Sequence, residues 1–237
     1  MPPTHATIQP NGGGVERRRL ATWIAHLRLA EHLIADGLQL DVEAFLVGSV
    51  APDSGLPNAD MTAYEPPKRI THWHGDDGEI DPEAYYARYL AQPSHDARAH
   101  AFHIGYYLHL VTDLEWTNTV WRPKKRTPLY HKALADLPTY LPEIKHDWYG
   151  LDFLYLKANP NCIFYKRFRF IDTVPDYLDY LPAGLLTETV RKIQSYYRRP
   201  EFDLDRPYHY LSAAEIDAFV DLAGMTLARL CRDKGWR

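Results

Sequence analysis

The chain has 237 residues, of which 46% are hydrophobic and 24% are charged, a composition that is ordinary for one globular domain. The formal net charge is -4 and the pI is about 6.3, so the chain lacks the basic footprint of a nucleic-acid-binding protein and we expect no stable nucleic-acid partner. His occurs 12 times, and several of these residues lie inside apolar stretches, which is a first indication of metal or acid–base chemistry.

The two cysteines, Cys162 and Cys231, are too few for a disulfide framework or a Cys-rich zinc site, and they favour a reducing compartment. Residues 1–15 are rich in Pro and Gly and contain no apolar run of the length that a signal peptide needs. A stretch of about 18 apolar residues, as a membrane span requires, is also missing. We therefore predict a flexible segment over residues 1–15, a single domain over residues 16–237, a cytoplasmic location and no membrane span.

Helical spacing of apolar residues begins early in the chain. The first predicted helix runs from about Glu16 to Ala35, and Asp36-Gly37 supplies a stop signal. A second predicted helix covers Val42–Val50 and ends at the turn-rich sequence Ala51–Gly55. Residues from Gly55 to about Asp81 are predicted as a loop.

The strongest predicted helix runs from about Asp96 to Leu114, and its second half is nearly apolar, so we expect it to be central and buried. A basic connection follows over Thr117–Pro128, and the best strand signal is Cys162–Tyr165. The pattern predicts an all-α, mainly helical bundle with long loops. Further helices are predicted at Tyr130–Leu137, Ile144–Lys157, Ala183–Tyr197 and Ala213–Cys231, the last after a capping box at Ser212–Glu215.

The pair His109 and Asp113 is the central chemical feature of this helix. Positions four apart share one face of a helix, with Cβ atoms roughly 5–6 Å apart. An imidazole and a carboxylate at that spacing can bind one metal ion or bridge two. The apolar neighbours Leu108, Leu110 and Val111 make an unpaired carboxylate costly. The spacing alone equally allows a His–Asp hydrogen bond in the core of a bundle.

Three residues upstream are further candidate ligands. His26 lies in an apolar helix, where a buried structural histidine is the commoner use. Asp53 follows Pro52 in a turn, a common position for Asp, and His72 lies in a loop, where histidines are usually solvated. Each has an ordinary explanation by itself. Their arrangement on a helix, a turn and a loop before the central helix indicates a shared metal site.

These segments resemble the zinc-dependent phospholipase C family, which shares its fold with single-strand-specific zinc nucleases. Four segments carry the resemblance in order: Thr22–Glu31, Phe45–Asp53, Thr71–Trp73 and Ala101–Asp113. They cover roughly the first half of the chain, and the ordered set is more specific than any one segment. The resemblance implies a phospholipase C/nuclease-like helical fold around a central metal site.

By that resemblance, Asp53, His72, His109 and Asp113 would bind one zinc ion, and Asp113 would bridge to a second zinc bound by His26. Nitrogen and carboxylate ligands suit Zn²⁺, and iron or manganese would accept the same set. The resemblance further implies a metal-activated water acting on a phosphoryl group, with Asp53 as the catalytic general base.

The sequence departs from the family at two places. Family members with the secreted architecture use their mature N-terminal residue as a ligand, whereas more than twenty residues precede His26 here. A third zinc would need a downstream His followed by His-x-x-x-Glu. His131 and His146 are present, but position 150 is glycine, and Asp147 is among the nearest acids. These three are weak candidate ligands, so the resemblance allows one to three zinc ions.

The basic connection contains Arg122 and Lys124, which are explained either as part of a solvated loop or as a rim that receives an anionic phosphate. The sequence thus predicts a metal-dependent hydrolase of phosphoesters or phosphodiesters, acting on a small-molecule or phosphodiester substrate. Two alternatives stay open. One is other chemistry at the same site, such as amide hydrolysis or iron-dependent oxidation. The other is a non-catalytic helical binding protein with core His–Asp hydrogen bonds.

Overall fold

The computed structural model describes residues 20–57, 64–198 and 203–237, and the predicted flexible segment over residues 1–15 lies outside them. Within the described ranges the chain is mainly helical, which confirms the predicted all-α class. A small ribbon pairs β1 (Leu56–Pro57) with β2 (Tyr64–Glu65) in antiparallel register. Across the same ranges, every helix falls short of the length or the hydropathy that a membrane crossing requires.

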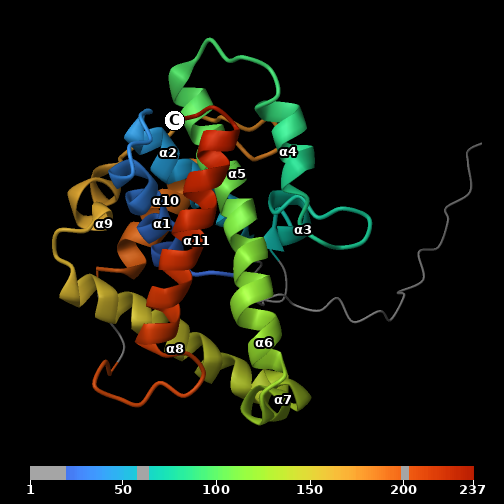
Figure 1. Cartoon of the computed structure of the whole chain (residues 1–237), viewed down its shortest axis with the longest axis vertical. Helices are drawn as coiled ribbons and strands as arrows, with labels where there is room; N and C mark the ends of the chain where they lie inside the picture. Colours follow the sequence, from blue (N-terminus) through green and yellow to red (C-terminus); the bar gives the residue numbers. More distant parts are fainter. Residues whose placement is uncertain (1–19, 58–63, 199–202) are drawn as a thin grey trace, which may run out of the picture.

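The centre of the bundle is α5 (Ala97–Trp116), whose middle turns are buried nearly all round. The shorter α2 (Val42–Gly48) packs along it, and the long α11 (Ala213–Asp233) runs beside it (Figure 1). The first helix, α1 (Trp23–Ala35), packs against α11 and also touches α5. Because neighbours surround α5, the side chains on its buried turns are held in fixed positions.

Shorter elements complete the bundle around this core. The helix α4 packs on α5, and α7 packs on α8. In Figure 1, α6 and α7 lie together at one end of the molecule. The bounds of these elements, in chain order, are η1 (Ala51–Asp53), α3 (Lys68–Thr71), α4 (Pro82–Tyr89), η2 (Thr117–Trp121), α6 (Arg122–Lys125), α7 (Pro128–Ala135), α8 (Leu137–Ala158), α9 (Ile163–Lys166), η3 (Phe168–Phe170) and α10 (Leu185–Tyr196).

Side-chain caps define the starts of the main helices. Thr22 caps α1, Asp41 caps α2 and Asp96 caps α5, each by accepting a backbone N–H of the first turn. The predicted capping box between Ser212 and Glu215 at the start of α11 is confirmed. Such a cap is worth about 0.5–2 kcal/mol, so these helix starts are set by local sequence.

The helices α2 and α5 cross closely because each presents a glycine to the backbone of the other. A Cβ added at Gly48 would clash with the carbonyl oxygen of Phe102, and one added at Gly105 would clash with the carbonyl oxygen of Phe45. This crossing brings the end of α2, and the η1 turn that follows it, against the middle of α5.

Two predicted elements are wrong. The predicted strand Cys162–Tyr165 is replaced by the helix α9, which packs on α1, so that tertiary contact overrides local β propensity. The predicted connection Thr117–Pro128 instead continues α5 through the π turn η2 into α6. Val120 and Trp121 are buried there, which keeps this part of the chain in the core.

Several boundaries also differ from the prediction. The first helix begins at Trp23 rather than at Glu16, a residue outside the described ranges, because Thr22 caps it. The helix α8 begins at residue 137 rather than at 144 and contains Pro142. The loop predicted between residues 55 and 81 includes the β1–β2 ribbon and the single turn α3.

Candidate metal centre

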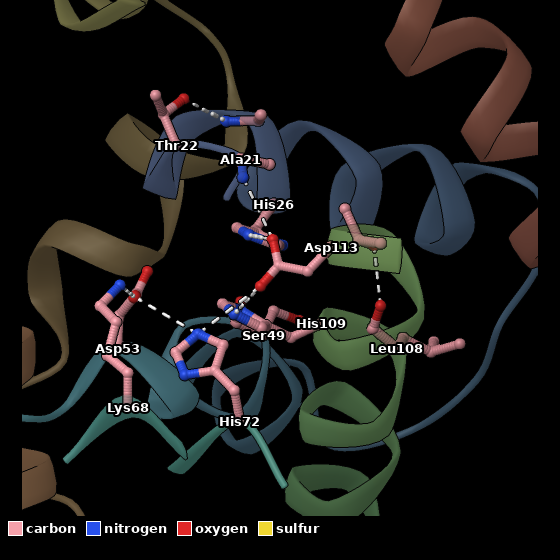
Figure 2. Close-up of polar contacts among 12 residues, drawn as sticks. Ala21, Thr22, His26, Ser49, Asp53, Lys68, His72, Leu108, His109 and Asp113 are labelled. Atoms are coloured by element: carbon pink, nitrogen blue, oxygen red, sulfur yellow. Dashed lines mark hydrogen bonds and ion pairs between the residues drawn. The ribbon is translucent and has the colours of Figure 1, made fainter. Parts of the chain in front are cut away.

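Five side chains predicted as metal ligands converge in the middle of the bundle from four separate elements (Figure 2). His26 comes from α1, Asp53 from the end of η1, His72 from the residue that ends α3, and His109 and Asp113 from successive turns of α5. All are buried except Asp53, which is partly exposed. The fold thus gathers residues that are far apart in the sequence.

Asp113 is at the centre of this cluster. Its Oδ2 lies 3.1 Å from His109 Nε2 and 3.5 Å from His72 Nε2, and its Oδ1 lies 3.4 Å from His26 Nε2. His72 Nε2 is also 3.6 Å from Asp53 Oδ1. Two overlapping sets of three donors each fit within 4.8 Å: His26, His109 and Asp113 form one set, and Asp53, His72 and His109 form the other.

These separations fit a shared cation. Zn²⁺ binds imidazole nitrogen and carboxylate oxygen at about 2.0–2.2 Å, so two ligands of one tetrahedral ion lie about 3.4 Å apart. The distances of 3.1, 3.5 and 3.6 Å around His72 and His109 scatter about that value. The donor set of imidazoles and carboxylates suits zinc, and iron or manganese would also accept it.

Five buried nitrogen and oxygen atoms of the cluster lack hydrogen bonds to the residues that the structure describes. They are both ring nitrogens of His26, Nε2 of His72, Nε2 of His109 and Oδ2 of Asp113. Buried polar atoms are nearly always hydrogen-bonded, because an unsatisfied one costs about 1–3 kcal/mol. A cation explains such a gathering of unsatisfied donor atoms better than a hydrogen-bonded core does.

Contacts behind the cluster orient two imidazoles. His109 Nδ1 lies 2.8 Å from the carbonyl oxygen of Ser49. Because a carbonyl only accepts, Nδ1 carries the proton, and a neutral His109 presents the lone pair of Nε2 to the cluster. His72 Nδ1 lies 3.1 Å from Thr71 Oγ1, which leaves Nε2 of that ring for the cluster as well.

The start of α1 supports Asp113 from the other side. The backbone N–H of Ala21 donates to Asp113 Oδ1 at 3.1 Å. The next residue, Thr22, donates its hydroxyl to Asp152 Oδ1 at 2.6 Å, and Tyr197 donates to Asp152 Oδ2 at 2.6 Å. A buried carboxyl on α8 thereby anchors the turn that contacts the cluster.

An aromatic anchor holds the segment around His72. The next residue, Trp73, has a φ of 50°, a conformation that is strained for a bulky side chain. Its indole N–H donates to the Tyr180 hydroxyl at 3.0 Å, and its ring packs against Tyr85 and Tyr89. These contacts offset the strain and fix the direction in which His72 points.

Charges inside the cluster set its protonation. Burial raises the pKa of Asp113, but His109 and His26 outweigh burial and hold that pKa well below its ordinary value. Burial lowers the pKa of His109, but Asp113 and Asp53 outweigh burial, so the pKa of His109 is raised. Burial and the charge of His109 lower the pKa of His26. The cluster is therefore an anionic carboxylate centre with a neutral His26 beside it.

Lys68 is a cation beside the cluster that the sequence analysis missed. Its Nζ lies 2.9 Å from Asp53 Oδ1, and its side chain is 42% exposed against 11% for Asp53. Burial raises the pKa of Asp53, but Lys68, His109 and His72 together outweigh burial and the net pKa is low. Burial and then Lys68 lower the pKa of His72 to about 3, so this imidazole is neutral at physiological pH. Lys68 precedes His72 by four residues, a signal that is useful only if α3 is recognised as a helix.

The weak candidates for a third metal lie outside the cluster. Asp147 is buried, but its Oδ1 pairs with Arg206 at 2.7 Å and its Oδ2 accepts the backbone N–H of Tyr210 at 2.6 Å. His131 is exposed on α7, and His146 is partly exposed on α8. Within the described ranges, none of these candidates joins a group of potential cation ligands. Asp147 has a structural role instead, because it ties α8 to the segment before α11.

The two residues of the predicted basic rim, Arg122 and Lys124, each form an ion pair at the surface. Arg122 lies 3.5 Å from Glu79, and Lys124 lies 2.6 Å from Glu215 at the start of α11. Both residues belong to α6, which follows the end of α5 (Figure 1), and neither joins the groups of potential cation ligands among the described residues. Lys68 is instead the basic residue that lies beside the cluster, paired with Asp53.

Comparisons of the chain with protein-family models, with curated proteins and with solved structures found no match. The resemblance to the zinc-dependent phospholipase C family therefore stays a prediction. This cluster is a candidate metal centre because of its own geometry.

Proposed function

We propose that the chain is a metal-dependent hydrolase of phosphoesters. The observation that supports this proposal is the convergence of Asp53, His72, His109 and Asp113 at ligand-to-ligand distances. Nε2 of His72, Nε2 of His109 and Oδ2 of Asp113 lack hydrogen bonds to the described residues. His26 and Asp113 would hold a second cation. A cation bound there would act as a Lewis acid that activates a water and neutralises charge on a phosphoryl group.

Residues of the chain would act as ligands, as proton acceptor and as supports for the ligands. Asp53 is the carboxylate of the cluster that reaches solvent, and Lys68 keeps it ionised. Its low pKa suits a ligand and makes it a weak base, so we place Asp53 first as a ligand and second as the group that accepts a proton from water. Ser49 and Ala21 hold His109 and Asp113 in place through backbone hydrogen bonds.

The charge beside Asp53 favours a phosphoester over a neutral amide. The ammonium of Lys68 is partly exposed at the edge of the cluster, where it attracts an anionic group. A scaffold protein with core His–Asp hydrogen bonds is disfavoured because His109 Nδ1 donates to the carbonyl of Ser49. A neutral His109 then has no proton on Nε2 to donate to Asp113 Oδ2, which lies 3.1 Å away.

The finer fold and the location belong to the same proposal. A phospholipase C/nuclease-like arrangement is supported by the order in which His26, Asp53, His72 and the pair on α5 enter the cluster. A cytoplasmic location is supported by the free, buried thiols of Cys162 and Cys231.

The test combines metal content with hydrolysis of bis(p-nitrophenyl) phosphate. We expect purified wild-type protein to contain at least one zinc, iron or manganese ion per chain by elemental analysis and to hydrolyse this phosphodiester. Asp113→Asn and His109→Ala should lose the metal and the activity together, because each removes a donor from the centre of the cluster.

The matched control is His103→Gln. His103 is a buried histidine of the same helix, and its Nδ1 lies 2.7 Å from the Tyr85 hydroxyl rather than in the cluster. This variant should lose stability but keep the metal. Metal content near zero in the wild type, or equal metal content in the wild type and Asp113→Asn, would overturn the proposal.

A further inference from the structure

Lys192 of α10 is a half-buried cation that the cluster does not use as a ligand. Its Nζ lies 6.0 Å from the centre of the Trp23 ring. Among the described residues, Asp53 and Glu188 act on its charge from beyond ion-pair distance. Desolvation penalises a charged ammonium group that has no carboxylate at ion-pair distance, so a bound anion would stabilise Lys192.

Lys192 belongs to the helix that packs against the exposed edge of the cluster. The helix α10 packs against η1, the turn that carries Asp53. The charge of Lys192 interacts with both Asp53 and Lys68, so two ammonium groups from different elements act on the cluster carboxylate that reaches solvent. Burial lowers the pKa of Lys192, and the neighbouring charge of Lys68 lowers it further, whereas Asp53 opposes the shift.

The two lysines differ in what their ammonium groups already bind. Lys68 donates to Asp53 Oδ1 at 2.9 Å, which occupies one of its hydrogens. The ammonium of Lys192 lies beside an aromatic group instead, in which Trp23, Tyr149 and Tyr196 contact one another with ring centres 5.3 to 6.0 Å apart. An aromatic face attracts a cation without using its hydrogen-bond donors, so these donors stay available to a ligand.

We propose that Lys192 is a substrate-binding residue that receives an anionic phosphoryl oxygen next to Asp53, with Lys68 as its partner. The proposal rests on the proposed function, because it names the part of the substrate that lies beside the metal cluster. Lys192 supplies charge-assisted hydrogen bonds to that oxygen and selects anionic esters over neutral ones.

The test uses the full chain and inorganic phosphate as the probe. Phosphate is titrated calorimetrically into zinc-loaded and EDTA-treated wild type, Lys192→Met, Lys192→Arg and Arg191→Gln. Arg191 is the matched control, because it precedes Lys192 on the same helix, carries the same charge, is exposed, and bonds to the carbonyl of Asp172. Lys192→Met should bind phosphate about tenfold more weakly in both states, since a charge-assisted bond is lost. Arg191→Gln should equal the wild type, and Lys192→Arg should restore most of the affinity.

The same variants separate binding from folding and from metal content. Lys192→Met should keep the zinc stoichiometry of the wild type and raise KM for bis(p-nitrophenyl) phosphate more than it lowers kcat. If that variant does not fold, Lys192→Gln replaces it. Equal phosphate affinity in Lys192→Met and Arg191→Gln, or no phosphate binding by the wild type, would overturn this inference while the zinc content still tests the proposed function. A wild type without zinc would overturn the proposed function, and the EDTA-treated titrations would still decide the role of Lys192.

Discussion

Asp152 is a single buried carboxyl group with two hydroxyl partners behind the start of α1. Burial raises the pKa of Asp152 to about 7, although the hydroxyls of Thr22 and Tyr197 oppose the shift. An aspartate in an unfolded chain titrates near 3.9. Between about pH 4 and pH 7, the folded chain therefore keeps a proton that the unfolded chain releases. Stability falls as the pH rises through this window.

Asp152→Asn should remove this dependence. The amide stays neutral, keeps the shape of the carboxyl group, and can accept from Thr22 while it donates to Tyr197. The free energy of unfolding of the variant should exceed that of the wild type by an amount that grows between pH 5 and pH 8, up to about 4 kcal/mol. Urea unfolding of EDTA-treated protein at the two pH values measures it. A difference that does not change with pH would contradict the assignment.

The sequence predicted contacts correctly where the two residues lie close together in the chain. His109 and Asp113 share a helix face because helical periodicity fixes it, so their proximity could be predicted from spacing. The place of Lys192 on the helix beside Asp53 could not be predicted from spacing, because α10 meets η1 only through tertiary packing. The ion pair of Asp147 with Arg206 is equally non-local, and the sequence therefore left Asp147 among the candidate ligands.

At the scale of elements, the crossing of α2 and α5 positions the cluster. Ser49 and Asp53 follow α2 directly, and their contacts with His109 and His72 depend on how closely α2 approaches α5. The approach depends on the absence of side chains at Gly48 and Gly105.

Gly105→Ala should therefore weaken the fold and the site together. Its Cβ would meet the carbonyl oxygen of Phe45, a backbone atom that cannot move aside alone. We expect a loss of about 1–3 kcal/mol in the free energy of unfolding, as for other overpacked cores, and weaker zinc binding. Chemical denaturation and zinc titration measure the two effects. Ala97→Ser, at an exposed position of the same helix, is the control. Unchanged stability in Gly105→Ala would show that the crossing tolerates a side chain.

The elements that could be predicted are those with caps and long apolar periodicity, such as α5 and α11. The segment Cys162–Tyr165 could not, because its few apolar residues suit a strand or a helix equally. Packing against α1 stabilises this segment as the helix α9. The π turn at Thr117–Trp121 escapes prediction for a related reason, since burial of Trp121 rather than local propensity continues the helix.

At the scale of the whole molecule, one cation would join η1, α3 and α5, and a second cation at His26 would join α1 to α5. A ligand that binds only the folded chain stabilises it by about 2.7 kcal/mol at 100 times its dissociation constant. For a chain of this size, that corresponds to a rise in Tm of roughly 5–10 °C.

Zinc added to metal-free wild type should therefore raise its Tm by that amount. His103→Gln should show a similar rise from a lower starting Tm, because its partner is Tyr85 and not the cluster. His109→Ala should show little or no rise. Differential scanning calorimetry measures these shifts. A similar rise in His109→Ala would place the stabilising ion elsewhere on the chain.

The central claim is that donors from distant parts of the chain share one cation. Anomalous diffraction at the zinc absorption edge, from crystals of the full chain grown with zinc, tests it most directly. We predict a peak within about 2.0–2.2 Å of His72 Nε2, His109 Nε2 and a carboxylate oxygen of Asp113. A peak only at exposed residues such as His131, or no peak between His72, His109 and Asp113, would contradict it.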